Sequence, residues 1–104
     1  MYRGTTPTNV FKTSQDLSDA DVVFITYKQR NTTVIEKKKE DITFGTEDDL
    51  FTLTVKLTQA ETLALDQDAR AVSIQIRARY PDGTAIASEV ISTSVEEVLK
   101  DGII

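Results

Sequence analysis

Apolar and polar residues alternate with a period of two along much of this chain, which is typical of β-strands with one buried face. The pattern is clearest over residues 50–58, LFTLTVKLT, and recurs over residues 71–80, AVSIQIRARY, and 84–93, TAIASEVIST. We predict a strand in each segment, with the apolar face of each strand in a shared core. The predicted core includes Phe51, Leu53, Val55, Ile74 and Ile76.

The tripeptide Pro-Asp-Gly separates the last two of these segments. Pro81 favours the φ angle of a turn, and Gly83 readily adopts the left-handed conformation of a three-residue hairpin loop, so Tyr80 is expected to pair with Thr84. In this register Gln75 lies opposite Glu89. Arg77 lies diagonal to Glu89, close enough for an ion pair between the two. The residues expected on the core face are Val72, Ile74, Ile76, Ala78, Tyr80, Ile86 and Val90.

Four further segments complete the seven predicted strands. The segment 21–29 has apolar residues on both faces, so we place it centrally, and Arg30-Asn31 suits a two-residue hairpin turn. Residues 58–65 break the alternation, and Thr58 with Glu61 forms a capping box that predicts one helical turn. The other predicted strands are 8–13, 32–38 and 41–45.

Seven short strands with frequent turns predict an all-β fold, an immunoglobulin-like antiparallel β-sandwich that forms a single domain over residues 1–104. An open barrel is the alternative. The segment 94–104 is predicted to be a short C-terminal helix, because Ser94 and Glu97 form a capping box and Gly102 is a suitable C-terminal cap. Two helical turns are not stable alone, so this helix is expected to pack on the sandwich.

The amino-acid composition restricts the kinds of catalytic and binding sites that this chain can form. The chain has no cysteine and no histidine, which excludes disulfides, thiolate metal sites and nucleophiles activated by histidine. Its formal net charge of −5 disfavours a nucleic-acid partner, because phosphate binding depends on cationic contacts. The first residues resemble no secretory signal, and no apolar run is long enough to span a membrane, so we expect a cytosolic protein without a membrane partner.

Acidic residues occur in turn-like clusters at Asp19/Asp21, 47–49 and Asp66/Asp68. Such oxygen ligands can bind calcium, but charge runs are usually solvated turns, and a filled sandwich core offers no cleft for a carboxylate pair. We therefore predict no catalytic residue, no metal site and no cofactor. The run of lysines at 37–39 is interpreted as protection of an edge strand rather than as a basic patch.

Two surfaces remain as candidates for binding a partner protein. Arg77 and Arg79 share the outer face of the predicted hairpin with Ala85 and Ala87, and arginine beside small residues suits a flat protein contact. An ordinary solvated face is the alternative. The second candidate is the apolar part of the C-terminal segment, which is expected either to cover the sandwich or to dock on another subunit; it comprises Val98, Leu99, Ile103 and Ile104.

The stretches RGTTPT, LTQAETL, VSIQIRARYPDGTAIAS and LKDGII resemble short proteins encoded by phages and prophages of Gram-positive bacteria. The resemblance spans almost the whole chain and is carried by structural motifs, so it transfers no functional residue. It implies an immunoglobulin-like structural or assembly protein, of the tail or baseplate, which acts in the host cytoplasm during assembly and ends in the virion.

Three functions are compatible with these features. The first is a non-enzymatic virion or assembly protein that binds itself or other virion proteins, with a homo-oligomer as one form. The alternative is a soluble binding module that inhibits a host protein. An enzyme is the least favoured, because it requires a deep pocket with convergent acids.

Overall fold

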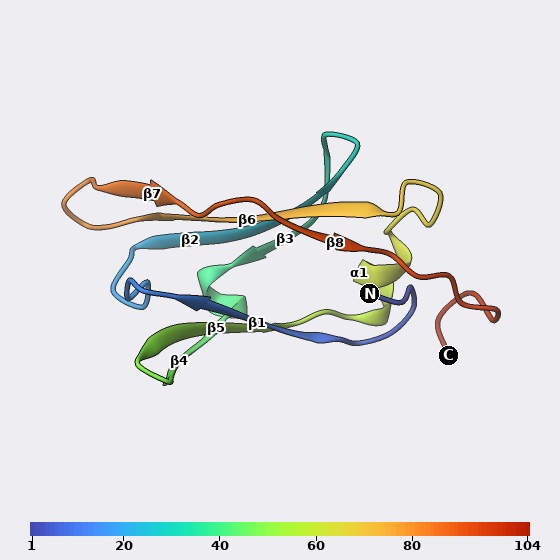
Figure 1. Ribbon diagram of the computed structural model, residues 1–104, viewed down its shortest axis with the longest axis horizontal. Helices are drawn as coiled ribbons and strands as arrows, with labels where there is room; N and C mark the ends of the chain where they lie inside the picture. The colour runs from blue at the N-terminus through green and yellow to red at the C-terminus, as the bar shows by residue number, and fades with distance from the viewer.

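Two antiparallel β-sheets lie face to face in the computed structural model, which describes residues 1–104 (Figure 1). The smaller sheet has the strand order β1-β5-β4, and the larger has the order β3-β2-β6-β7, with β8 also paired to β6. The sandwich expected from the sequence is confirmed. The elements are β1 (Thr8–Thr13), β2 (Val22–Gln29), β3 (Thr32–Lys38), a 3₁₀ turn (Lys39–Asp41), β4 (Thr43–Glu47), β5 (Leu50–Lys56), α1 (Gln59–Leu63), β6 (Ala71–Arg79), β7 (Ala85–Ala87) and β8 (Ile91–Ser94).

The hairpin turns follow from the residues that occupy them. Arg30 and Asn31 both have positive φ angles, 48° and 62°, which match the two-residue turn expected between β2 and β3. Asp48 and Asp49 do the same between β4 and β5. After β6, the Tyr80 N–H donates to the Thr84 carbonyl at 2.8 Å, as expected for this hairpin.

The helical turn α1 lies at one end of the sandwich, beside both chain termini (Figure 1). Thr58 and Glu61 form the predicted capping box, with hydrogen bonds of 2.9 and 3.1 Å between side chain and backbone. The carboxyl end of the turn is held by Arg3, whose guanidinium donates to the carbonyls of Leu63 and Leu65. Arg3 therefore satisfies helix-end carbonyls that would otherwise lack partners.

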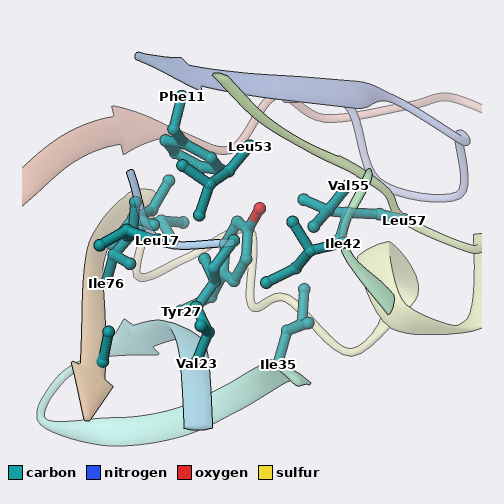
Figure 2. Packing of buried hydrophobic residues seen from close by; sticks show 14 of the residues in the cluster. Phe11, Leu17, Val23, Tyr27, Ile35, Ile42, Leu53, Val55, Leu57 and Ile76 are labelled. Atoms are coloured by element: carbon teal, nitrogen blue, oxygen red, sulfur yellow. The ribbon is translucent and has the colours of Figure 1, made fainter. Parts of the chain in front are cut away.

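Side chains from both sheets meet between the layers, with the ring of Tyr27 near the centre of the group in Figure 2. Tyr27 is fully buried, and the Asn9 side chain of the opposite sheet donates to its hydroxyl at 2.8 Å. Phe51 is a partial exception to the predicted core, because it lies next to the Asp48-Asp49 turn and is only half-buried. The other four predicted core residues, Leu53, Val55, Ile74 and Ile76, are buried.

The strand expected over residues 84–93 is interrupted. Arg77 pairs with Ala87 and Ile74 with Ile91, so the second strand advances four residues while β6 advances three. The extra residue breaks the strand into β7 and β8 and reverses which side chains face the core. Val90, predicted to be in the core, is therefore 59% exposed, and Ile91 faces the same side of the sheet as Ile74.

The C-terminal helix predicted over residues 94–104 is not present. Ser94 ends β8, the buried Val95 donates its N–H to the Arg70 carbonyl, and Glu96 forms a parallel bridge with Tyr2. These tertiary hydrogen bonds occupy backbone groups that the helix would need, and a helix of two turns is too short to compete with them. The capping pattern was therefore misleading, and Gly102 has a positive φ angle without ending a helix.

Replacing Ile74 with alanine should lower the free energy of unfolding by about 2–5 kcal/mol, because the surrounding core cannot close the cavity fully. Its ladder partner Ile91 is the matched control, since it is 42% exposed and Ile91→Ala should cost clearly less. Urea denaturation of both variants measures the difference. Equal losses would contradict the difference in burial between these two paired residues.

Candidate functional site

The outer face of the larger sheet holds the first predicted contact surface. Arg77 pairs with Ala87 and Arg79 with Ala85, and directly paired residues of an antiparallel ladder point to the same side. All four side chains are exposed. The structure therefore brings this predicted set together, two arginines on β6 beside two alanines on β7.

Two residues that the sequence analysis did not assign to the site complete it. Val22 and Phe24 of β2 pair with Arg79 and Arg77, are half-buried, and point to the same outer face. With Ala85 and the two arginines they line a hollow of about 210 Å³. The sequence could have indicated these two residues, because both faces of β2 are apolar. This pattern was interpreted only as a sign of a central strand, but it also predicts apolar side chains on the outer face of the sheet.

A second hollow of about 290 Å³ lies on the other side of Arg77 along the same face. Its lining includes Lys28, Gln75 and the exposed Val90, which the register slip turns outward. The outer face thus combines an uneven apolar floor with long cationic side chains. A face of this composition suits protein contact better than a face of lysine, glutamate and threonine.

The cations of this face have no carboxylate partner. The protein has five ion pairs, and none of them includes Arg77, Arg79, Lys28 or Lys38. The possible ion pair between Arg77 and Glu89 is absent, because the interruption after β7 places Ser88 rather than Glu89 beside Gln75. The Gln75 side chain donates to the Ser88 carbonyl at 3.0 Å, and the Ser88 hydroxyl accepts from the Ile76 N–H at 2.9 Å.

The second predicted surface, the C-terminal segment, lies at the opposite end of the molecule (Figure 1). Val98 is half-buried, whereas Leu99 is fully exposed and Ile103 and Ile104 are largely exposed. The segment is attached by an ion pair of 2.9 Å between Asp101 and Arg3. The structure therefore does not join the two predicted surfaces into one site.

The acidic turns do not converge on a metal site, because no three carboxylates of the structure gather as a ligand set. Asp48 and Asp49 form a hairpin turn, and the Asp66 carboxylate accepts from the Asp68 N–H at 2.8 Å. Asp16 and Asp82 accept comparable hydrogen bonds from Ser18 and Thr84, which lower the pKa of each carboxyl. These carboxylates thus stabilise local turns.

Two partly buried polar pairs link the two sheets to each other and β3 to α1. The Lys37 ammonium of β3 lies 2.7 Å from the Glu61 carboxylate of α1. Burial raises the pKa of Glu61, but hydrogen bonds from Lys37 and Thr58 outweigh it, so the net pKa is lowered. Burial also raises the pKa of Tyr27 to about 12, despite the hydrogen bond from Asn9. At neutral pH these groups are an ion pair and a neutral phenol, which suits a structural role.

Comparisons with protein-family models, with curated proteins and with solved structures find no match to this chain. No helix of the structure has the length and apolar character needed to cross a membrane. The outer face of the larger sheet is therefore the basis for a functional proposal.

Changing Glu61 to glutamine should lower the free energy of unfolding at neutral pH by about 1–3 kcal/mol, because Lys37 loses its carboxylate partner in a mostly buried position. The pKa of Glu61 is lower in the folded than in the unfolded state. The stabilisation is therefore fully present above the unfolded pKa and is lost as the pH falls through the folded pKa.

Urea denaturation across the acidic range measures this effect, with Glu36→Gln as control because Glu36 is exposed and belongs to no ion pair. The difference in stability between the wild type and Glu61→Gln should shrink towards low pH. A difference that is constant with pH would show that the carboxylate charge is not what stabilises α1.

Proposed function

We propose that this protein is a non-enzymatic structural or assembly protein of a phage or prophage, which acts in a tail or baseplate through contacts with other virion proteins. The observation that carries the proposal is the outer face of the larger sheet, where unpaired arginines surround an apolar floor. Association of this kind takes place in the host cytoplasm during assembly, and the protein then remains in the virion.

The order of the strands supports an immunoglobulin-type sandwich, the architecture that this proposal expects. In immunoglobulin domains, strands B, E and D pair in one sheet, and G, F and C in the other, with C′ beside C in the variable type. If β1 corresponds to strand B, β2 to β6 to strands C, C′, D, E and F, and β7 with β8 to G, every pairing of both sheets agrees. The helical turn α1 then lies between strands E and F.

The charge of the face indicates the chemistry of its partner. Unpaired arginines next to small and aromatic side chains fit a flat protein surface that presents carboxylates. A second copy of this chain has such groups, because Asp48 and Asp49 lie at an exposed turn and belong to no ion pair. The proposal therefore includes homo-oligomers as well as contacts with other virion proteins.

Purified chains should form species heavier than the 11.6 kDa monomer at millimolar concentration. Arg77→Glu should lower the average mass, because it reverses a charge at the centre of the face without removing a core side chain. Added salt should act in the same direction by screening the contact. Size-exclusion chromatography with light scattering measures the mass.

The control is Lys56→Glu, an identical change of charge at an exposed position of the other sheet that has no ion pair. It should leave the mass unchanged. A strict monomer at millimolar concentration, or equal effects of the two substitutions, would remove the support for self-association through this face.

A further inference from the structure

The outer edge of β7 carries main-chain groups that no other strand covers. The Tyr80–Thr84 and Ile76–Ser88 hydrogen bonds define which residues of this strand bond to β6. Because bonded and non-bonded positions alternate in an antiparallel ladder, the N–H and C=O groups of Ala85 and Ala87 point away from β6. Strand β7 is the end of its sheet, so these groups face the open edge.

The other sheet edges are protected in ways that β7 is not. Strand β3 carries Lys37 and Lys38, β1 carries Lys12, and β4 has a glycine at its centre and Glu47 at its end. The adjoining edge beyond β8 is covered by residues 1–3, whose backbone bonds to Ser94 and Glu96. Charged side chains and covering segments normally prevent edge-to-edge pairing, whereas β7 is short but consists only of alanine, isoleucine and alanine and carries no charge.

A groove of about 310 Å³ runs along the inner side of this edge. Leu17, Ile76, Ala78 and Ile86 supply its apolar lining, and Thr13 and Gln15 lie at the end of β1 across from β7. Ile86 is only half-buried, so the core is incompletely covered here. A strand placed along β7 would satisfy the free main-chain groups and cover this apolar groove together.

We propose that β7 pairs antiparallel with β7 of a second copy of this chain, related by a two-fold axis that passes beside Ile86. The sequence of the strand fits its own copy. With Ile86 opposite Ile86 of the second copy, Ala85 lies opposite Ala87 in both directions. These are the residues whose main-chain groups are free, and the two pairs form about four hydrogen bonds.

The charges of the outer face permit this arrangement. On the outer face, one row of paired residues crosses the contact between the two copies. It consists of Arg77 and Ala87 of the first copy, followed by Ala85 and Arg79 of the second copy. Three strand spacings separate the two arginines, about 14 Å, which exceeds the Debye length of about 8 Å at physiological salt. The four alanines at the join also let the strands approach, and the two outer faces form one continuous cationic surface.

The inference deepens the proposed function and rests on it, because it names a second copy as one partner and edge pairing as one contact. A two-fold contact ends at the dimer. Growth to larger assemblies then needs the separate contact through Arg77. The edge contact involves few residues and is expected to be weak, and it is detectable only at high concentration.

Cysteine cross-linking tests the register directly, because the chain has no native cysteine. Residues on the two-fold axis at a non-hydrogen-bonded position have Cα atoms about 4.5 Å apart, within disulfide range. Ile86→Cys should therefore give a disulfide-linked dimer on mild oxidation. Ala85→Cys is the control, because the two copies of position 85 lie diagonally, about 7–8 Å apart, and should not link.

A mixture of Ala85→Cys and Ala87→Cys should link one variant to the other, as these residues are opposite in the proposed register. Failure of Ile86→Cys to cross-link, or equal linking of Ala85→Cys to itself, would overturn the edge pairing. Non-reducing electrophoresis and intact mass spectrometry distinguish the products.

Proline substitution provides an independent test. Ala85→Pro removes an N–H that faces the open edge and leaves the bonds to β6 intact, so the chain should fold and have a lower average mass than the wild type in light scattering. Val10→Pro is the matched control. The Leu57–Pro7 hydrogen bond places the Val10 N–H on the open edge of β1, where no pairing is proposed. The Val10→Pro variant should therefore have the same average mass as the wild type.

The two proposals fail in different ways. If Arg77→Glu lowers the mass and Ala85→Pro does not, association uses the outer face alone and the edge pairing is wrong. If Ala85→Pro abolishes the dimer and Arg77→Glu leaves the mass of the wild type unchanged, edge pairing stands and the face contact is wrong. A strict monomer in every variant overturns both.

Discussion

The ladder between β2 and β6 is the constraint on which the rest of the structure depends. It runs over seven consecutive pairs, from Val22 with Arg79 to Lys28 with Ser73, at the centre of the larger sheet. Since alternate side chains point to opposite faces, one register decides both faces at once. It turns Ile25, Tyr27, Ile74 and Ile76 into the core, and it places Phe24 beside Arg77 on the outer face. The buried core and the candidate contact surface are thus two results of the same pairing.

The interruption after β7 has consequences on three levels. Locally, one extra residue turns Val90 outward, and Ser88 supplies hydrogen bonds where a regular ladder would continue. At the level of the sheet, it divides one edge into a covered part at β8 and an open part at β7. At the level of the outer face, it removes the carboxylate that a regular hairpin would have placed near Arg77, so the arginines of this face have no carboxylate partner.

Polar contacts hold the end of the sandwich where strands are few. Arg3 joins the carbonyl end of α1 to Asp101, and Lys37 joins β3 to Glu61, which also caps α1. A helix of five residues has little stability of its own, so its position depends on these charged partners and on the buried Thr62. The sandwich is closed here by hydrogen bonds and ion pairs, while the opposite end, with β7, is left partly open.

The sequence by itself determined what depends on neighbouring residues. Two-residue alternation predicted the strands, positive φ at Arg30 and Asn31 followed from turn chemistry, and the Thr58–Glu61 box correctly predicted α1. The same local rules placed Arg77 and Arg79 beside Ala85 and Ala87, because a hairpin pairs residues that are close in the chain.

Only the tertiary structure decided the rest, since it depends on competition between distant groups. Backbone bonds from Arg70 and residues 1–3 replaced the helix expected after Ser94, the register slip exchanged Val90 for Ile91, and the β2–β6 pairing brought Phe24 to the arginines. Capping patterns and alternation cannot predict such bonds, because the partners are separated by tens of residues. The bonds form only when both sheets have brought these partners together.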